Sequence, residues 1–277
     1  MSNLRNKLLL ACVLVVGGAS AAQAGVGGSA EKIRNAVQSG SQDAILAEVE
    51  RAEYLTCPAC VETMTDLLDD ERPAVREVAA WWFARRPSVA QGFLDRSLTD
   101  LNGSDGRLAR NAADFLGVFR NVKHIAPLSA ALTSGKLSSE ARAHVAAALG
   151  RIGNAQADTA LAQAMSTGDA QVKTAAVQAW LAIREQKGAA PVIALIADGD
   201  AGVRAAAAGA VGELREATGR ANLEAALGDT DAVVRRNAAW ALGQLGQAAS
   251  RPALEKASHD ASPLVASTAK AALSQLH

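Results

Sequence analysis

Residues 234–243 read Val-Arg-Arg-Asn-Ala-Ala-Trp-Ala-Leu-Gly, and related segments recur along most of the chain. We take Val234 as the anchor residue of this segment. The seven equivalent anchors follow one another at intervals of 33, 33, 31, 31, 31 and 31 residues, and a fixed period between 20 and 50 residues is typical of stacked repeats. The anchors are Val75, Leu108, Ala141, Val172, Val203, Val234 and Val265.

Each repeat is predicted to begin with an amphipathic helix, which we call the first helix. Apolar or small residues stand four and eight positions after every anchor, and this spacing places them on one helical face. Three positions before the anchor, six of the seven repeats carry Asp or Ser, whose side chains can cap the free N–H groups of a starting helix. These predicted caps are Asp105, Ser138, Asp169, Asp200, Asp231 and Ser262, and Arg72 is the exception.

A second helix is predicted in each repeat, because an apolar residue also recurs twenty positions after five of the anchors. Proline stands near the start of three of these segments, where a missing backbone N–H costs little. One more divergent repeat precedes the seven, with Ala44 at the anchor position, and the last repeat has room for its first helix only. The sequence therefore predicts an all-α fold, a right-handed α-solenoid of about seven to eight two-helix repeats.

The repeats carry a recognisable family pattern. Val203-Arg204 and Val234-Arg235, the Asp three residues before each anchor, and residues 238–243 resemble the bacterial HEAT-repeat family, including the HEAT-like repeats of the phycobilisome-lyase type. The resemblance covers roughly residues 40–277. It implies the fold and says little about activity, because the family includes scaffolds, lyases and binding subunits, and fold does not determine function.

Residues 1–24 differ from the rest of the chain and are typical of a secretory signal peptide. Arg5 and Lys7 precede an apolar core over residues 8–18, and Ala22-Gln23-Ala24 offers a small-residue cleavage site before Gly25. The segment is too short to span a membrane, and no other stretch is long and apolar enough. We therefore expect export, to the periplasm or beyond the cell, with an N-terminal segment and capping helix over residues 25–40 and the solenoid over residues 41–277.

The charge balance argues against nucleic acid as a partner. The chain has 28 basic and 28 acidic residues, and a nucleic-acid-binding protein needs a basic stripe. Basic residues do recur one position after five anchors, and we predict that they pair with turn carboxylates such as Asp200 and Asp231 of adjacent repeats. These basic residues are Arg76, Arg142, Lys173, Arg204 and Arg235.

Cys57-Pro58-Ala59-Cys60 is the chemically most specific motif after the signal peptide. The repeat spacing places Cys60 at the start of a second helix, and an exported protein favours a structural disulfide between the two cysteines. The alternative is a thiol–disulfide or electron-transfer accessory protein that uses Cys57 and Cys60. A structural pair should have a reduction potential below about −300 mV, and a catalytic pair a higher one.

No other motif points to catalysis, a cofactor or a metal. Haem attachment would need His at position 61, which is Val61, and a zinc site lacks further ligands near the cysteine pair. The paired aspartates at 198–200 and 229–231 lack the remaining ligands of a calcium loop. We therefore expect no catalytic residues, no metal and no cofactor.

The sequence favours a non-enzymatic scaffold or adaptor that binds another protein along the concave face of the solenoid. We expect the second helices to line that face and to supply its specificity. Trp81 and Trp240 stand six positions after their anchors, where they either contact a partner or pack against the neighbouring repeat. The partner-binding candidates are Thr65, Asp66, Trp81, Gln163, Glu224, Trp240, Glu255 and Lys256.

Overall fold

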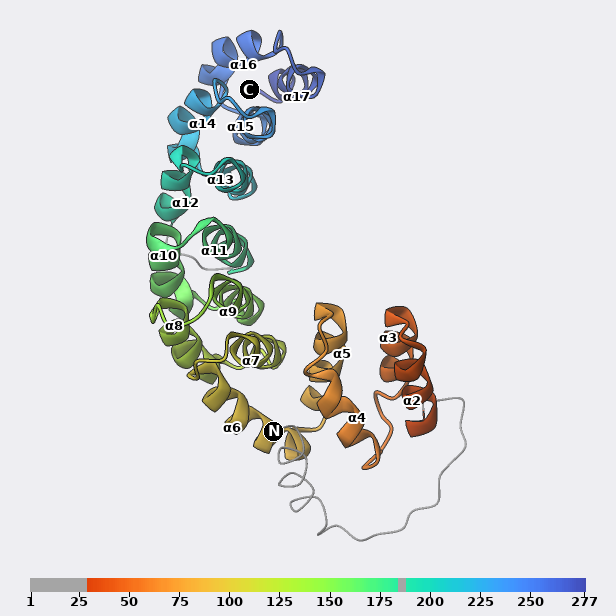
Figure 1. Cartoon of the computed structure of the whole chain (residues 1–277). Helices are drawn as coiled ribbons and strands as arrows, with labels where there is room; N and C mark the ends of the chain where they lie inside the picture. Colours follow the sequence, from red (N-terminus) through yellow and green to blue (C-terminus); the bar gives the residue numbers. More distant parts are fainter. Residues whose placement is uncertain (1–28, 184–187) are drawn as a thin grey trace. The chain divides into compact units, whose positions relative to one another are not determined.

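The computed structural model describes residues 29–183 and 188–277, so the predicted signal peptide and its cleavage site lie outside the described residues. All regular structure in these two ranges is helical, with 16 α-helices, five short 3-10 helices and no strand (Figure 1). The all-α solenoid predicted from the repeat spacing is confirmed.

The described residues form two compact units, residues 29–88 and residues 89–277 without 184–187. Within the described part of the first unit, Ser29 and Ser41 cap the first two helices through their side-chain oxygens. The third helix begins at Cys60, as the repeat spacing predicts. The helices of this unit are α2 (Ala30–Ser39), α3 (Gln42–Arg51), α4 (Cys60–Leu67) and α5 (Pro73–Ala84).

The second unit contains the remaining helices, and α6 (Pro87–Leu101) starts two residues before the boundary. Its first helices are α7 (Gly106–Val118), α9 (Ser139–Ile152), α11 (Ala170–Ala182), α13 (Ala201–Glu213), α15 (Ala232–Leu245) and α17 (Pro263–Leu273). Its second helices are α8 (Ile125–Thr133), α10 (Asp158–Thr167), α12 (Ala190–Ala194), α14 (Arg220–Ala226) and α16 (Arg251–Ala257). The short 3-10 helices are η1 (Val122–His124), η2 (Ala155–Ala157), η3 (Leu195–Ala197), η4 (Ala217–Gly219) and η5 (Ala248–Ser250).

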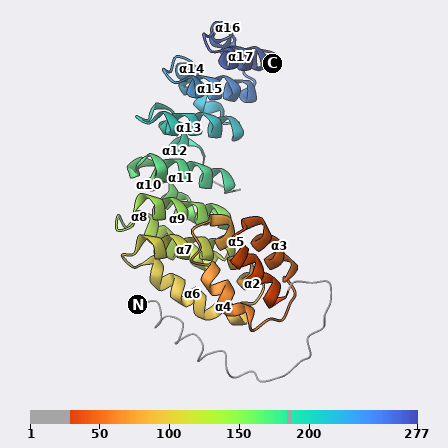
Figure 2. The same ribbon diagram turned by 45° about the vertical axis from the view of Figure 1, so that its right-hand side comes forward.

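Two parallel rows of helices make up the second unit (Figures 1 and 2). The first helices α7, α9, α11, α13, α15 and α17 stack in one row, and the second helices α8, α10, α12, α14 and α16 stack in the other. The unit curves, with the first helices on the inner side of the curve and the second helices on the outer side (Figure 1). We call them the inner row and the outer row.

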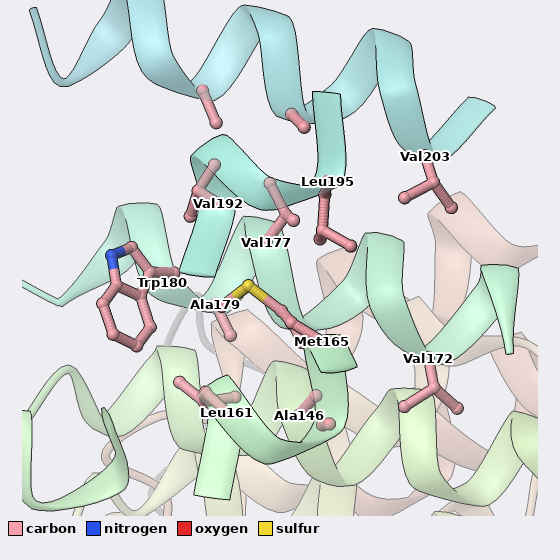
Figure 3. Packing of buried hydrophobic residues seen from close by; sticks show 14 of the residues in the cluster. Ala146, Leu161, Met165, Val172, Val177, Ala179, Trp180, Val192, Leu195 and Val203 are labelled. Atoms are coloured by element: carbon pink, nitrogen blue, oxygen red, sulfur yellow. The ribbon is translucent and has the colours of Figure 1, made fainter. Parts of the chain in front are cut away.

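The core lies between the two rows and is continuous through the second unit. Figure 3 shows a part of it, with Leu161 and Met165 of α10 and Val177 of α11 in one continuous cluster that also includes Leu195 and Val203. The five apolar residues twenty positions after their anchors are all fully buried, and each stabilises the fold by roughly 2 kcal/mol. Among the anchors only Leu108 departs from the prediction, because it is half-buried where the other six have no exposed surface.

Five of the six predicted helix caps make the expected hydrogen bonds. The side chains of Asp105, Ser138, Asp169, Asp200 and Asp231 accept from backbone N–H groups in the first turn of the helix that follows. Ser262 stands at the predicted position but its side chain makes no capping bond. Pro263 follows it, and a proline needs no partner for its nitrogen at that position.

Glycine and alanine face each other at several close contacts along the inner row. A Cβ atom placed on Gly150 would lie 2.7 Å from the Cα of Ala179, and one on Gly212 would lie 2.7 Å from the Cα of Ala241. Gly117 and Gly243 make the same kind of contact with the next helix of the row. In α11 the equivalent residue is Leu181, and the α11 and α13 ribbons are more widely spaced than their neighbours (Figures 1 and 2).

Candidate functional site

The residue one position before the anchor is exposed on every helix of the inner row. On α15 this residue is Val233, and the exposed Arg236 and Trp240 and the half-buried Asn237 lie on the same side of the helix. These positions lie on the side of the helix that faces away from the buried stripe, as the helical period requires. The inner row is therefore a repeat-built surface whose chemistry varies from one helix to the next.

The exposed face of α15 is apolar with one cation. Trp240 is 37% exposed, and one edge of its ring lies where a side chain on Gly212 of α13 would be, 2.7 Å from that Cβ position. Trp240 thus packs against the neighbouring repeat and still presents part of its ring to solvent. Next to it, Asn237 donates its amide to the Ala205 carbonyl at 2.9 Å and accepts the Arg236 guanidinium at 3.3–3.4 Å.

The equivalent face of α7 and α9 is polar and internally paired. Arg110 donates to Asn111 Oδ1 at 3.1 Å and to Glu140 Oε1 of α9 at 2.8 Å. Asp114, at the repeat position of Trp240, is buried and accepts from Arg151 at 2.9 Å, with His144 Nδ1 at 2.8 Å. The sequence reasoning missed this network, although the Arg-Asn pairs at 110–111 and 236–237 recur at the same repeat positions.

The basic residues one position after the anchors form a ladder with carboxylates of the next repeat. Arg204 binds Asp229 through Nε at 2.7 Å and a second nitrogen at 2.9 Å, and Arg235 binds Asp260 in the same way. Each arginine also donates to two backbone carbonyls in the turn before its own helix. These bidentate ion pairs lower the pKa of Asp229 and of Asp260.

The predicted pairing with turn carboxylates is therefore confirmed, but the expected partners Asp200 and Asp231 are wrong. Their side chains already accept backbone N–H groups as helix caps. The arginines instead bind aspartates that stand two residues before a cap. Arg142 departs from the ladder and donates to the Leu132 carbonyl, since Thr167 stands where the aspartate would be.

The prediction that second helices line the concave side is wrong for the second unit, because they form the outer row (Figure 1). Small residues let the first helices approach closely, so we infer that the stack curves toward that row. Gln163, Glu255 and Lys256 are exposed on the outer row, and their contact with a partner stays a prediction. Glu224 is half-buried and accepts from Arg220 at 2.7 Å and from Ser250 at 2.8 Å, which links α14 to η5.

In the first unit, the candidates Thr65, Asp66 and Trp81 make contacts of their own. Thr65 donates its hydroxyl to the Val61 carbonyl at 2.7 Å. Partial burial is the main cause that raises the pKa of Asp66, and the neighbouring carboxylates of Glu62 and Asp69 raise it further. Trp81 is half-buried, and the Arg85 guanidinium lies 5.3 Å from its ring centre. A role of these residues in binding stays a prediction.

Cys57 and Cys60 form a disulfide, so the predicted pairing of the two cysteines is confirmed. Cys60 is buried at the start of α4, and Cys57 is half-buried. The segment that leads to Cys57 is also held by Arg86, which donates to the carbonyls of Ala52, Glu53 and Leu55 at 2.8–2.9 Å. The same guanidinium lies 3.8 Å above the ring centre of Trp82.

The family model for HEAT repeats matches residues 95–180 and 189–274. This chain belongs to the HEAT-repeat family. The matched residues include the inner row except for the last two residues of α11, whereas the cysteine pair lies before them. A search of curated proteins found no match.

Several solved structures resemble this chain in fold. A structure in which Kap95p binds RanGDP matches with a TM-score of 0.58 at 12% identity, covering 88% of this chain and 41% of that chain. The Escherichia coli protein YibA matches with a TM-score of 0.56 at 13% identity, covering 98% and 96%. The complex of CpcE and CpcF of phycocyanin lyase from Nostoc sp. PCC7120 matches with a TM-score of 0.42 at 23% identity, covering 78% and 86%.

Two further observations apply to the described residues of this HEAT-repeat chain. None of their helices is long and apolar enough to cross a bilayer. They also contain no group of three or more His, Cys, Asp or Glu side chains placed to hold a metal ion.

Proposed function

We propose that this HEAT-repeat chain is an exported bacterial protein, periplasmic or secreted, that binds another protein and catalyses no reaction. The observation that carries the proposal is the inner row of the second unit. Its helices α7, α9, α11, α13, α15 and α17 lie side by side along one curved surface (Figure 1), and each exposes the residue that precedes its anchor. Curved solenoid surfaces of this kind serve as extended binding faces.

The binding surface we propose is the inner row, in place of the outer row that the sequence favoured. Side chains on a concave face can contact one partner together, whereas those on a convex face point apart. The inner row also carries most of the exposed large apolar side chains of the second unit, and such residues mark interaction sites when they cluster.

Two glutamines provide a matched test of which row binds. Gln178 is exposed on α11 of the inner row, and Gln163 is exposed on α10 of the outer row. A photo-crosslinking amino acid at each position in turn, introduced in the source organism, should give a discrete protein adduct from position 178 and none from position 163. The proposal fails if position 178 gives no adduct or if both positions give the same adducts.

Export is tested separately, by sequencing the N-terminus of the protein recovered from its source. We expect the mature chain to start at Gly25, since Ala22 and Ala24 satisfy the small-residue requirement for signal cleavage. A chain that retains Met1, or that starts at Cys12 with attached lipid, would overturn this part of the proposal.

A further inference from the structure

The inner face of α15 and α17 carries a cluster of exposed apolar side chains. Five large apolar residues are exposed in the described part of the chain, and three of them belong to these two helices: Val233 is 48% exposed, Trp240 37% and Leu264 64%. Val233 and Leu264 occupy the same position in consecutive repeats. Trp240 lies seven residues, or about two turns, after Val233 and therefore shares its face.

A cation lies among these apolar groups. Arg236 is exposed, and its guanidinium is oriented by Asn237 Oδ1 at 3.3–3.4 Å. Asn237 is itself fixed by its hydrogen bond to the Ala205 carbonyl. In the part of the chain that the structure describes, no carboxylate pairs with Arg236. The guanidinium thus lies beside Asn237, and no described carboxylate neutralises its charge.

The α7–α9 pair shows what is missing around Arg236. Arg110 and Asn111 occupy the same two repeat positions as Arg236 and Asn237, and there the guanidinium binds Glu140 at 2.8 Å. In α17 the position equivalent to Glu140 is held by Leu264. The C-terminal repeats thus keep the arginine and its orienting asparagine but replace the carboxylate with an apolar side chain.

We propose that α15 and α17 bind an acidic peptide segment that also carries apolar side chains. A partner carboxylate takes the place that Glu140 has beside Arg110 and pairs with Arg236. Leucine or aromatic side chains next to that carboxylate contact Trp240, Val233 and Leu264. Arginine and tryptophan together are typical of residues that contribute most of the energy of an interface.

The apolar surroundings favour a peptide over a nucleic acid. A phosphate would pair with Arg236 equally well and a base would stack on Trp240. Val233 and Leu264, however, would then lie against a sugar–phosphate backbone that offers them no apolar surface. This inference rests on the proposed function, since it assigns a partner chemistry to one part of the inner row.

Fluorescence anisotropy on the purified chain tests the proposal. The probe is a fluorescein-labelled peptide Ser-Glu-Glu-Leu-Phe-Glu-Leu-Ser. Two control peptides replace either the glutamates with glutamines or the leucines and phenylalanine with serines. We expect the probe to bind at least 10-fold more tightly than either control peptide.

Variants then assign the binding to this face. Arg236→Glu and Trp240→Ala should each weaken probe binding at least 10-fold, and the milder Arg236→Gln guards against an effect of misfolding. Arg251→Glu is the matched control, because Arg251 is exposed on α16 of the outer row. It should leave probe binding unchanged, with circular dichroism confirming that every variant is folded.

The inference is overturned if the probe does not bind, if Arg236→Glu binds it as the wild type does, or if labelled oligo-dT competes with it at Arg236. The crosslinking experiment at position 178 distinguishes a failure of this inference from a failure of the proposed function. An adduct at position 178 together with a negative peptide result removes only the inference. Loss of that adduct removes the proposed function itself.

Discussion

The α7–α9 pair and the α15–α17 pair use the same repeat positions on the inner row for opposite purposes. In α7–α9, Arg110 binds Glu140, and Asp114 is shared by His144 and Arg151, so the polar groups satisfy one another. In α15–α17 the corresponding positions present Trp240 and Arg236, an arginine that pairs with no carboxylate of residues 29–183 and 188–277. The difference teaches that the same repeat backbone can carry either polar side chains that pair with one another or side chains that are available to bind a partner.

The largest difference between the two pairs should appear in stability. Asp114→Ala removes a buried carboxylate that accepts from two helix α9 side chains, and we expect it to lower the free energy of unfolding by roughly 3 kcal/mol. Trp240→Ala, at the same repeat position, should cost about 1 kcal/mol, because that side chain is partly exposed. Urea denaturation compares the two variants, and equal losses would contradict the distinction.

The second prediction concerns the close helix contact, which Gly117 makes between α7 and α9 and Gly212 makes between α13 and α15. Gly212→Ala and Gly117→Ala would each place a Cβ within 2.9 Å of a Cα atom on the next helix, and should cost about 1–3 kcal/mol. Gly209→Ala is the matched control in α13, because its Cβ would meet only the Asn237 amide at 3.8 Å. It should stabilise the helix by about 0.5–1 kcal/mol in the same denaturation assay, and a loss there would show that the close contact is not the cause.

The third prediction concerns pH and the ladder, which Lys173, Arg204 and Arg235 form at α11, α13 and α15 and which is absent at α9. Ion pairs with Arg204 and Arg235 lower the pKa of Asp229 and Asp260 in the folded chain. A lowered folded pKa contributes stability above the ordinary carboxyl pKa of about 3.9, and this contribution is lost as the pH falls through the folded pKa. The urea midpoint should therefore fall more steeply below about pH 5 in wild type than in Asp229→Asn or Asp260→Asn.

Arg251→Gln serves as the control for that pH series, because Arg251 pairs with no carboxylate among the described residues. Its urea midpoint should follow the wild-type pH profile. If Asp229→Asn and Asp260→Asn also follow that profile, the ladder contributes no pH-dependent stability.

The smallest effect on stability is expected from Leu264→Glu, which transfers the Glu140 arrangement to the C-terminal pair. The new ion pair with Arg236 would be exposed, so the free energy of unfolding should change by less than about 0.5 kcal/mol. Binding of the acidic probe should nevertheless fall at least 10-fold, because Arg236 then has a partner within the chain. Unchanged binding would contradict the role assigned to Arg236.

Much of the fold could be predicted because it depends on local periodicity. The anchors, the capping aspartates and the start of α4 at Cys60 each follow from spacing along one helix or one turn. Which row of helices lies on the inner side of the curve could not be predicted, because curvature depends on contacts between helices of different repeats. The glycines that make those contacts recur nine residues after their anchors, and this period is visible in the sequence. Its role in helix packing becomes evident only from the contact of Gly150 with Ala179 in the structure.

The candidate site was only partly predictable for a related reason. Trp240 stood out by residue type and proved to be exposed. Arg236 did not, since its importance lies in the absence of a neighbour that Arg110 has in Glu140. Ion-pair partners 25 or 30 residues apart become evident only once adjacent repeats are superposed, which also explains why Asp229 was missed as the partner of Arg204.

Leu181, the residue that interrupts the glycine series of the inner row, has a mechanical consequence. Repeats that touch only their neighbours behave as springs in series, so the softest spring takes most of the extension. The joint between α11 and α13 lacks the glycine-to-alanine contact of the other inner-row joints, and we expect it to be the softest. Pulled from its two ends, the second unit should lengthen first at that joint, while the α15–α17 surface keeps its geometry.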